Sequence, residues 1–478
     1  MSATRNRLIP TPYSQNKIDN TIAGVNSLAF PGVNWQDILF KNQAVNQRVN
    51  LNISGGGKVA RYYVAGSLSD DQGVLKVDSR NNFNNNINFK RYQLRTNVNI
   101  NLSKTTKVNV RLSGAFDDYT GPRQGGSEIY SRSLTTSPVL FQPYYQPDEG
   151  TKYAKHILFG NALAPSGNGF YFNPYADLVT GYKEDTNSTL IAQIEFNQDL
   201  KFITEGLSLK GVVSSTRKAN YSVSRGYDPF YYTQLQNRET KEVSLFGLNP
   251  DDGSTTLDFE AAPSTVDAAT YAEVRINYSR EFNEKHAVGG LLVHTINDRV
   301  LSATSGDLQA SLPFRNQGLS GRFTYGYDDR YFTELNFGYN GSERFAKSER
   351  WGFFPSGAIG WVASNEKFLE NVDFLDNLKF KASYGLVGND QIGNDSDRFF
   401  YISNVLLNQA NKGFLTGSDL TNENFIPGVG ITRYGNDQIT WETGHKLNIG
   451  LELGLFNALT LELDLFSETR TNILSDRI

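Results

Sequence analysis

The feature that most constrains this chain is a stretch in which side chains alternate strictly on both sides of a tight reversal. Leu, Gly, Phe, Tyr and Tyr occupy every second position of residues 319–327, and the alternation resumes over residues 331–339. Only Asp328, Asp329 and Arg330 separate the two runs. A period of two on both arms of so short a turn predicts a β-hairpin. Each arm runs about nine residues, against about five or six in a typical strand, so we expect strands that cross something.

The same unit recurs along the chain as a strand, a short turn, a second strand and a long polar loop. The clearest pair spans residues 91–116, where apolar residues alternate with Arg, Gln and Asn on both sides of the turn SKTTK. Further hairpins are predicted around residues 55–58, 199–206, 281–285 and 456–457, and around a short amphipathic helix at residues 368–372. This gives about seven hairpins, or about 14 strands, with the tight turns at one end and the long loops at the other. Such asymmetry is typical of outer-membrane barrels, with short periplasmic turns and long extracellular loops.

Composition fits an all-β membrane barrel. Aromatic residues make up 13% of the chain, which also has 43 Gly, a mixture typical of twisted sheets and girdled barrels. No window approaches about 18 consecutive apolar residues, which excludes a transmembrane helix. The mean hydropathy of -0.44 is compatible with a barrel because only alternate residues face lipid. We expect the Leu face to meet lipid and the Arg, Asn and Glu face to line a polar lumen. A soluble sandwich or propeller shares the alternation, but explains neither the strand length nor the one-sided loops.

Charge and cysteine content exclude other classes. The 46 Lys and Arg nearly balance the 50 Asp and Glu, so no electrostatic argument favours a nucleic-acid partner. The absence of Cys excludes disulfides and Cys-ligated metals. The first 30 residues lack the charged and apolar regions of a signal peptide.

Seven segments spread over nearly the whole chain carry a more specific signal. They are VNWQDILFKNQAVNQRVNLNISGG (33–56), YYVAGSLSDDQGVL (62–75), GRFTYGYDDRYFTELNFGYNGSERF (321–345), WGFFPSGAIGWVASNEKFL (351–369), LKFKASYGLVGNDQIG (378–393), ITWETGHKLNIGLELGLF (439–456) and LDLFSETRTNIL (463–474). In this combination and order they resemble the barrel of SusC/RagA-type TonB-dependent outer-membrane transporters of Bacteroidota.

The resemblance implies a barrel of about 22 strands that holds an N-terminal plug. It also implies import of oligosaccharides or peptides across the cell outer membrane, energy from the TonB system, and a SusD-like surface lipoprotein over the extracellular mouth. No plug-like or TonB-contacting sequence precedes Phe30, and the chain stops at Ile478, shortly after a strand. We therefore expect residues 1–40 to be a lead-in or loop segment and residues 41–478 to be part of an outer-membrane β-barrel.

Three alternatives share the main features of the sequence. A self-closing barrel of about 14 strands is allowed, since even strand numbers from about 8 upward occur. A passive porin or a surface adhesin needs no plug. An outer-membrane hydrolase would carry its active site on the loops.

No motif indicates catalysis, a cofactor or a metal site. The four His are scattered and lack the HExxH spacing of zinc enzymes. The run Ser54–Lys58 lacks the spacing of a phosphate-binding loop and is expected to be a turn. Glu452, Glu462 and Asp464 share one strand face. Paired carboxylates can perform acid–base chemistry or bind calcium, but on an inward barrel face we expect them to solvate the lumen.

The long loops hold the candidate ligand contacts, because they are rich in Tyr, Asn, Asp and Gly. Aromatic faces beside amides suit stacking against sugar rings or packing on peptides. The alternative is that these aromatic residues pack loop against loop or dock the partner lipoprotein. The candidates are Tyr144, Tyr145, Tyr171, Tyr231 and Tyr232.

Overall fold

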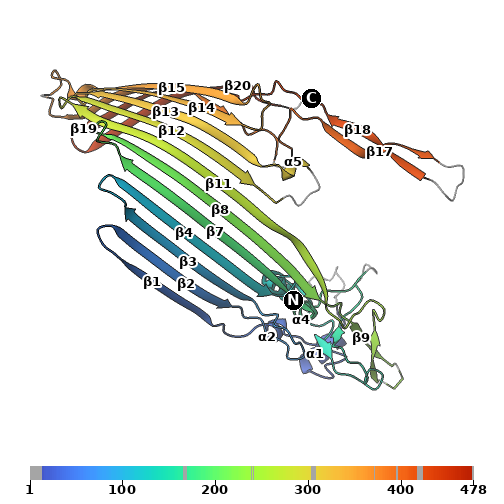
Figure 1. Ribbon diagram of the computed structural model, residues 1–478. Helices are drawn as coiled ribbons and strands as arrows, with labels where there is room; N and C mark the ends of the chain where they lie inside the picture. Colours follow the sequence, from blue (N-terminus) through green and yellow to red (C-terminus); the bar gives the residue numbers. More distant parts are fainter. Residues whose placement is uncertain are drawn as a thin grey trace.

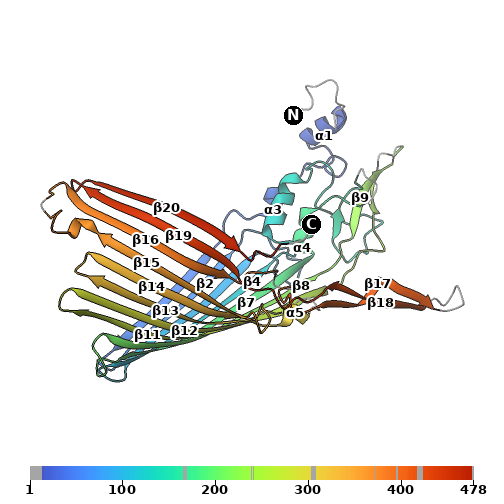
Figure 2. The same ribbon diagram turned by 90° about the horizontal axis from the view of Figure 1, so that it is seen from above.

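The computed structural model describes residues 13–164, 169–237, 239–240, 242–302, 308–370, 372–394, 397–416 and 424–475. Its main feature is one antiparallel sheet of 14 strands, in which the strands follow one another in chain order. The sheet curls into a trough (Figure 1 and Figure 2) with β1 and β20 at its two edges. Its strands are β1 (Asn46–Gly56), β2 (Ala60–Gln72), β3 (Asn88–Asn101), β4 (Thr106–Gly121), β7 (Gly181–Asp199), β8 (Leu207–Gly226), β11 (Asp258–Phe282), β12 (His286–Val300), β13 (Phe314–Tyr327), β14 (Tyr331–Ser342), β15 (Trp351–Val362), β16 (Leu375–Asn389), β19 (Glu442–Leu455) and β20 (Leu459–Thr471). The predicted all-β class and the strand number are confirmed.

The connections between these strands are strongly one-sided, as the sequence predicts. At one end of the sheet they are short, at residues 57–59, 102–105, 200–206, 283–285, 328–330, 363–374 and 456–458. At the other end they are mostly longer, at residues 73–87, 122–180, 227–257, 301–313, 343–350 and 390–441. The longest strand, β11, has 25 residues, whereas a membrane-spanning strand needs about 9–11. The sheet therefore continues well beyond the thickness of a bilayer.

The hairpin of β13 and β14 has the predicted register. Leu319 pairs with Tyr339 and Tyr327 with Tyr331, so the apolar residues of both arms share one face. In the turn, Asp328 and Asp329 both have a φ of 52°. Two left-handed central residues are what the hairpin turn of type I′ requires, and Asp adopts this conformation more readily than most residues. The turns at residues 283–284 and 456–457 use the same backbone conformation.

The prediction of an amphipathic helix at residues 368–372 is wrong. Between β15 and β16 the chain instead forms a 3₁₀ helix, η2 (Ala363–Asn365), followed by turns whose amides bond carbonyls three residues earlier. So short a stretch cannot meet the cost of nucleating an α-helix by itself. The chain is held here by Glu366, which accepts hydrogen bonds from Tyr331 Oη at 2.6 Å and Arg330 Nη1 at 3.0 Å.

The two faces of the sheet differ in chemistry. Between β19 and β20 the register pairs Leu453 with Leu461 on one face and Glu452 with Glu462 on the other. On the polar face, Lys381 of β16 lies 3.1 Å from Glu452, 2.7 Å from Glu462 and 3.5 Å from Asp464. The predicted sharing of one face by these three carboxylates is confirmed. Among the described residues, no helix is long and apolar enough to cross a membrane.

The long loops at the ends of β1 to β11 fold into a compact assembly (Figure 1). We call the described parts of residues 13–40, 73–87, 122–180 and 227–257 the loop unit. Its elements are α1 (Gln15–Ala23), α2 (Trp35–Leu39), α3 (Gly126–Thr135), α4 (Pro174–Val179) and a four-stranded sheet of β10 (Val243–Gly247), β9 (Tyr231–Gln236), β6 (Leu158–Gly160) and β5 (Tyr144–Tyr145). The sequence indicated only irregular loops here.

The loop unit has the largest buried apolar cluster of the described chain. Trp35, Leu39, Leu75, Phe141 and Leu178 are each no more than 3% exposed within it. The described part of the lead-in segment therefore packs against loops that follow the first strands. The division at residue 40 stays a prediction.

A second assembly lies at the loop ends of the later strands. The hairpin of β17 (Asn404–Thr416) and β18 (Asn424–Arg433) projects away from the main sheet (Figure 2), and α5 (Leu308–Ser311) lies near its base.

Candidate ligand-binding site

The loop unit brings the five predicted tyrosines together, although they come from distant parts of the sequence. Tyr144 and Tyr145 form β5, and Tyr231 and Tyr232 begin β9. Both strands pair with β6, so a strand of only three residues holds the two pairs side by side. Tyr171 donates its amide hydrogen to the carbonyl of Ala162, just beyond β6.

The five tyrosines differ in how far a ligand can reach them. Tyr145 is only 4% exposed, while Tyr171 and Tyr231 pack against the buried cluster. These three side chains mainly pack loop against loop, which was the alternative left open by the sequence. Tyr144 packs against the same cluster, and Tyr144 and Tyr232 are half-buried, as Tyr171 and Tyr231 are. The role of all five as ligand contacts stays a prediction.

Arg80, which the sequence did not single out, organises the centre of the site. Its guanidinium donates to Asp78 through Nε at 2.9 Å and Nη2 at 2.6 Å, and Nη2 also donates to Tyr175 Oη at 2.5 Å. The guanidinium lies over the ring of Tyr144, 4.3 Å from its centroid, and Tyr144 stacks on Tyr175. The hydroxyl of Tyr175 donates in turn to Asp78. One cation thus joins two loops and the small sheet.

The charge state of Asp78 follows from these contacts. Burial opposes ionisation of the carboxyl, but the hydrogen bonds from Arg80 and Tyr175 outweigh it and lower the pKa of Asp78 to about 2. Burial, and then the bond to this carboxylate, raise the pKa of Tyr175. At neutral pH the cluster therefore contains a carboxylate, a guanidinium and a neutral phenol.

Two pockets open on either side of Arg80 and share it together with Gln146. The larger has a volume of about 780 Å³, and the smaller has about 570 Å³. Both volumes lie within the range of small-molecule sites. The larger pocket is lined by Ile38, Lys76, Val77, Asp78, Ser79, Arg80, Gln142, Pro143, Tyr144, Gln146, Tyr175, Leu178 and Val179. The smaller pocket is lined by Arg80, Asn81, Tyr145, Gln146, Pro147, Ala154, Lys155, His156, Ile157, Leu158, Tyr227, Ser254 and Thr255.

His156 forms part of the wall of the smaller pocket. Its Nε2 atom lies 2.9 Å from Tyr232 Oη, and its ring stacks on Phe230 with centroids 4.1 Å apart. Burial lowers the pKa of His156, and it raises the pKa of Tyr227 to about 12. Both side chains are therefore neutral at pH 7 and offer hydrogen bonds. Sequence spacing gave no signal for His156 because its partners lie more than 70 residues away in the chain.

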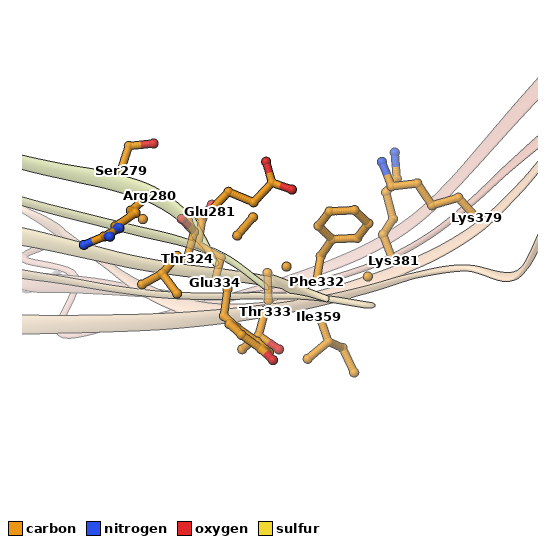
Figure 3. A pocket seen from close by; sticks show the side chains of 17 residues that line it. Ser279, Arg280, Glu281, Thr324, Phe332, Thr333, Glu334, Ile359, Lys379 and Lys381 are labelled. Atoms are coloured by element: carbon orange, nitrogen blue, oxygen red, sulfur yellow. The ribbon is translucent and has the colours of Figure 1, made fainter. Parts of the chain in front are cut away.

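A third hollow, of about 510 Å³, lies near the short-turn end of the main sheet between β11 and β16 (Figure 3). In Figure 3, Phe332, Lys379 and Lys381 lie on one side of the sheet and Ile359 on the other. Phe332 stands between Gly326 and Gly360 of the flanking strands. An aromatic ring across from glycines covers exposed backbone. Packing within the sheet therefore explains the position of Phe332 without a ligand.

The described residues contain no group of three or more His, Asp or Glu arranged to hold a metal ion. The carboxylates of Glu452, Glu462 and Asp464 each form an ion pair with Lys381, and Glu452 also pairs with Lys379. The arrangement can bind and orient a polar ligand through aromatic rings, amides and cations.

Sequence comparison relates the chain to TonB-dependent receptors. It is 25% identical over 475 residues to TonB-dependent receptor P26 of Formosa agariphila, covering 94% of this chain and 42% of that protein. It is 22% identical over 464 residues to TonB-dependent receptor SusC of Bacteroides thetaiotaomicron, covering 90% of this chain and 41% of SusC. The chain thus spans less than half the length of these relatives. No protein-family profile matches it.

Structural comparison agrees on the fold. The RagAB peptide importer in its open-open state superposes with a TM-score of 0.60 at 20% identity, covering 96% of this chain and 50% of that one. The closed-closed state gives a TM-score of 0.57 at 19% identity. The 14-stranded sheet therefore shares its fold with about half of that chain. The predicted similarity to SusC-type TonB-dependent receptors is confirmed by the sequence relatives.

Proposed function

We propose that this chain supplies the barrel portion of a TonB-linked importer that takes up oligosaccharides or peptides through a gated lumen. The observation that carries the proposal is the joining of one curved sheet, polar on one face, to a loop unit with two adjoining pockets. The similarity to receptors named for TonB dependence supports it. The step is binding and passage, without covalent chemistry.

The proposed partners follow from the same comparisons. A SusD-like surface lipoprotein is proposed at the loop end of the sheet, and the TonB system at the short-turn end, acting through a plug. Outer-membrane lipid is proposed to contact the Leu face of the strands, because lipid tolerates only apolar side chains on a barrel exterior.

The test uses the full-length protein in cells grown on defined oligosaccharides or peptides as sole carbon source. Deleting the gene is expected to abolish growth on the cognate nutrient, and removing TonB is expected to have the same effect. Uptake that persists without TonB would contradict the proposal and favour a passive porin. Hydrolysis of the nutrient by the purified protein would favour the hydrolase alternative.

A further inference from the structure

The smaller pocket of the loop unit has an unbalanced charge. Its lining residues include Arg80, Lys155 and the neutral His156. No Asp or Glu is among them. The nearby carboxylate of Asp78 is already bonded to Arg80 and Tyr175. The pocket therefore presents cationic and neutral groups to a ligand.

Both cations keep hydrogen-bonding capacity for a ligand. Arginine has five N–H donors, and the hydrogen bonds of Arg80 to Asp78 and Tyr175 use Nε and Nη2. The two N–H groups of Nη1 make no hydrogen bond to any residue that the structure describes. Lys155 is exposed and makes no ion pair with any other residue that the structure describes, whereas Lys152, three residues earlier, is paired with Glu149 at 2.6 Å.

The remaining lining residues suit a sugar. Tyr227 contributes aromatic surface, and Asn81, Gln146 and Ser254 contribute amide and hydroxyl groups. Aromatic faces pack on the apolar faces of sugar rings, and amides hydrogen-bond the ring hydroxyls. A peptide fits less well, since the lining includes no carboxylate for an N-terminal ammonium group.

We infer that this pocket binds an acidic sugar unit of a glycan, with its carboxylate or sulfate ester between Arg80 and Lys155. The inference rests on the proposed importer function and specifies its ligand class. The charge of Arg80 is offset by Asp78, so Lys155 supplies the net positive charge and Arg80 supplies N–H donors. Both act more strongly on an anion in a partly enclosed pocket than in open water.

The test is binding to the purified full-length protein in detergent, measured by calorimetry. The probes are a galacturonic acid trimer, a galactose trimer sulfated on each unit, and the neutral galactose trimer. At least one acidic trimer is expected to bind about tenfold more tightly than the neutral trimer, with an affinity that falls as salt is added. Comparing the galacturonic acid trimer with the sulfated galactose trimer distinguishes a carboxylate from a sulfate ester.

Two matched lysine variants test whether the acidic trimer binds in this pocket. Lys155→Gln is expected to weaken binding of the acidic trimer about five- to tenfold, because a charge-assisted contact is lost. Lys152→Gln removes the same charge from the same loop outside the pocket and is expected to change binding less than about twofold. Since both lysines are on the surface, neither variant is expected to affect folding.

Three results would overturn the inference. They are equal binding of neutral and acidic trimers, equal effects of the two lysine variants, and no binding of either acidic trimer. Binding of a free hexapeptide, but not of its C-terminally amidated form or of the sugars, would assign the anion to a peptide instead. Failure of the importer function would appear separately, as loss of TonB dependence in cells while the purified protein still binds the acidic trimer.

Discussion

Arg80, in the loop after β2, lies over the ring of Tyr144 in β5, with 4.3 Å between the guanidinium carbon and the ring centroid. This contact joins the connection between β2 and β3 to the connection between β4 and β7 of the main sheet. Because the guanidinium is also bonded to Asp78, its position is fixed from two directions. Arg80 thus acts as the common wall of two pockets, and its removal would merge or collapse them.

Replacing Asp78 tests how far this cluster stabilises the loop unit. Asp78→Asn removes the charge that pairs with Arg80 and one of the two oxygens that accept hydrogen bonds from Arg80 and Tyr175. We expect a loss of about 1–3 kcal/mol in local stability. Hydrogen exchange of the loop unit in the purified protein measures the loss. The exposed Asp251→Asn serves as control and is expected to have no effect. Unchanged exchange in Asp78→Asn would contradict the proposed role of the cluster.

Acid should weaken the same cluster within a defined range of pH. The pKa of Asp78 is about 2 in the folded chain, below the ordinary aspartate value of about 4. Its stabilising contribution is therefore complete above about pH 4 and is lost as the pH falls toward 2. Amide protection in the loop unit, corrected for the intrinsic pH dependence of exchange, is expected to fall between pH 5 and 2 in the native protein and to fall less in Asp78→Asn. Parallel pH profiles would argue against this assignment.

The two faces of β20 should respond differently to substitution. Leu461→Arg is expected to cost about 2–4 kcal/mol if the residue sits at mid-bilayer. Glu462 is on the opposite face and 59% exposed in its pair with Lys381, so Glu462→Gln is expected to cost about 1 kcal/mol or less. Urea unfolding of the full-length protein in lipid vesicles, followed by heat-modifiable gel migration, measures both. Equal tolerance at the two positions would count against lipid on the Leu face.

The turn between β13 and β14 gives a local test of the backbone. Asp329 has a φ of 52°, which a β-branched residue adopts only with strain. Asp329→Val is expected to destabilise the hairpin by about 1–3 kcal/mol, whereas Asp329→Gly is expected to be neutral or slightly stabilising. The thermal midpoint of heat-modifiable migration reports both variants. A valine variant as stable as the glycine variant would show that the turn adopts another conformation.

The main sheet was predictable because its signal is local. A period of two places Phe323 and Leu335 on one face whatever surrounds them, and the short turn sets their pairing. The full length of β7, β8 and β11 was not predictable, because these strands continue into polar sequence, where the alternation fades. The connection after β15 was mistaken for a helix because its apolar spacing also suits consecutive 3₁₀-type turns.

The site was only partly predictable. Aromatic composition pointed to Tyr144 and Tyr232, but nothing in the sequence links them to Arg80 or His156. These contacts join residues more than 60 positions apart through loops without a regular period. The buried cluster was missed for the same reason, since Leu75 and Phe141 lie in irregular segments whose apolar residues show no pattern.

The packing of the segment before β1 has a mechanical consequence. Val33 donates its amide hydrogen to the carbonyl of Pro138 at 2.8 Å, Leu39 is fully buried in the loop unit, and Ile38 lines the larger pocket. The segment ahead of β1 therefore forms part of the wall of the larger pocket. A force along that segment would therefore act on the pocket wall at Ile38 before it acts on β1, the first strand of the sheet.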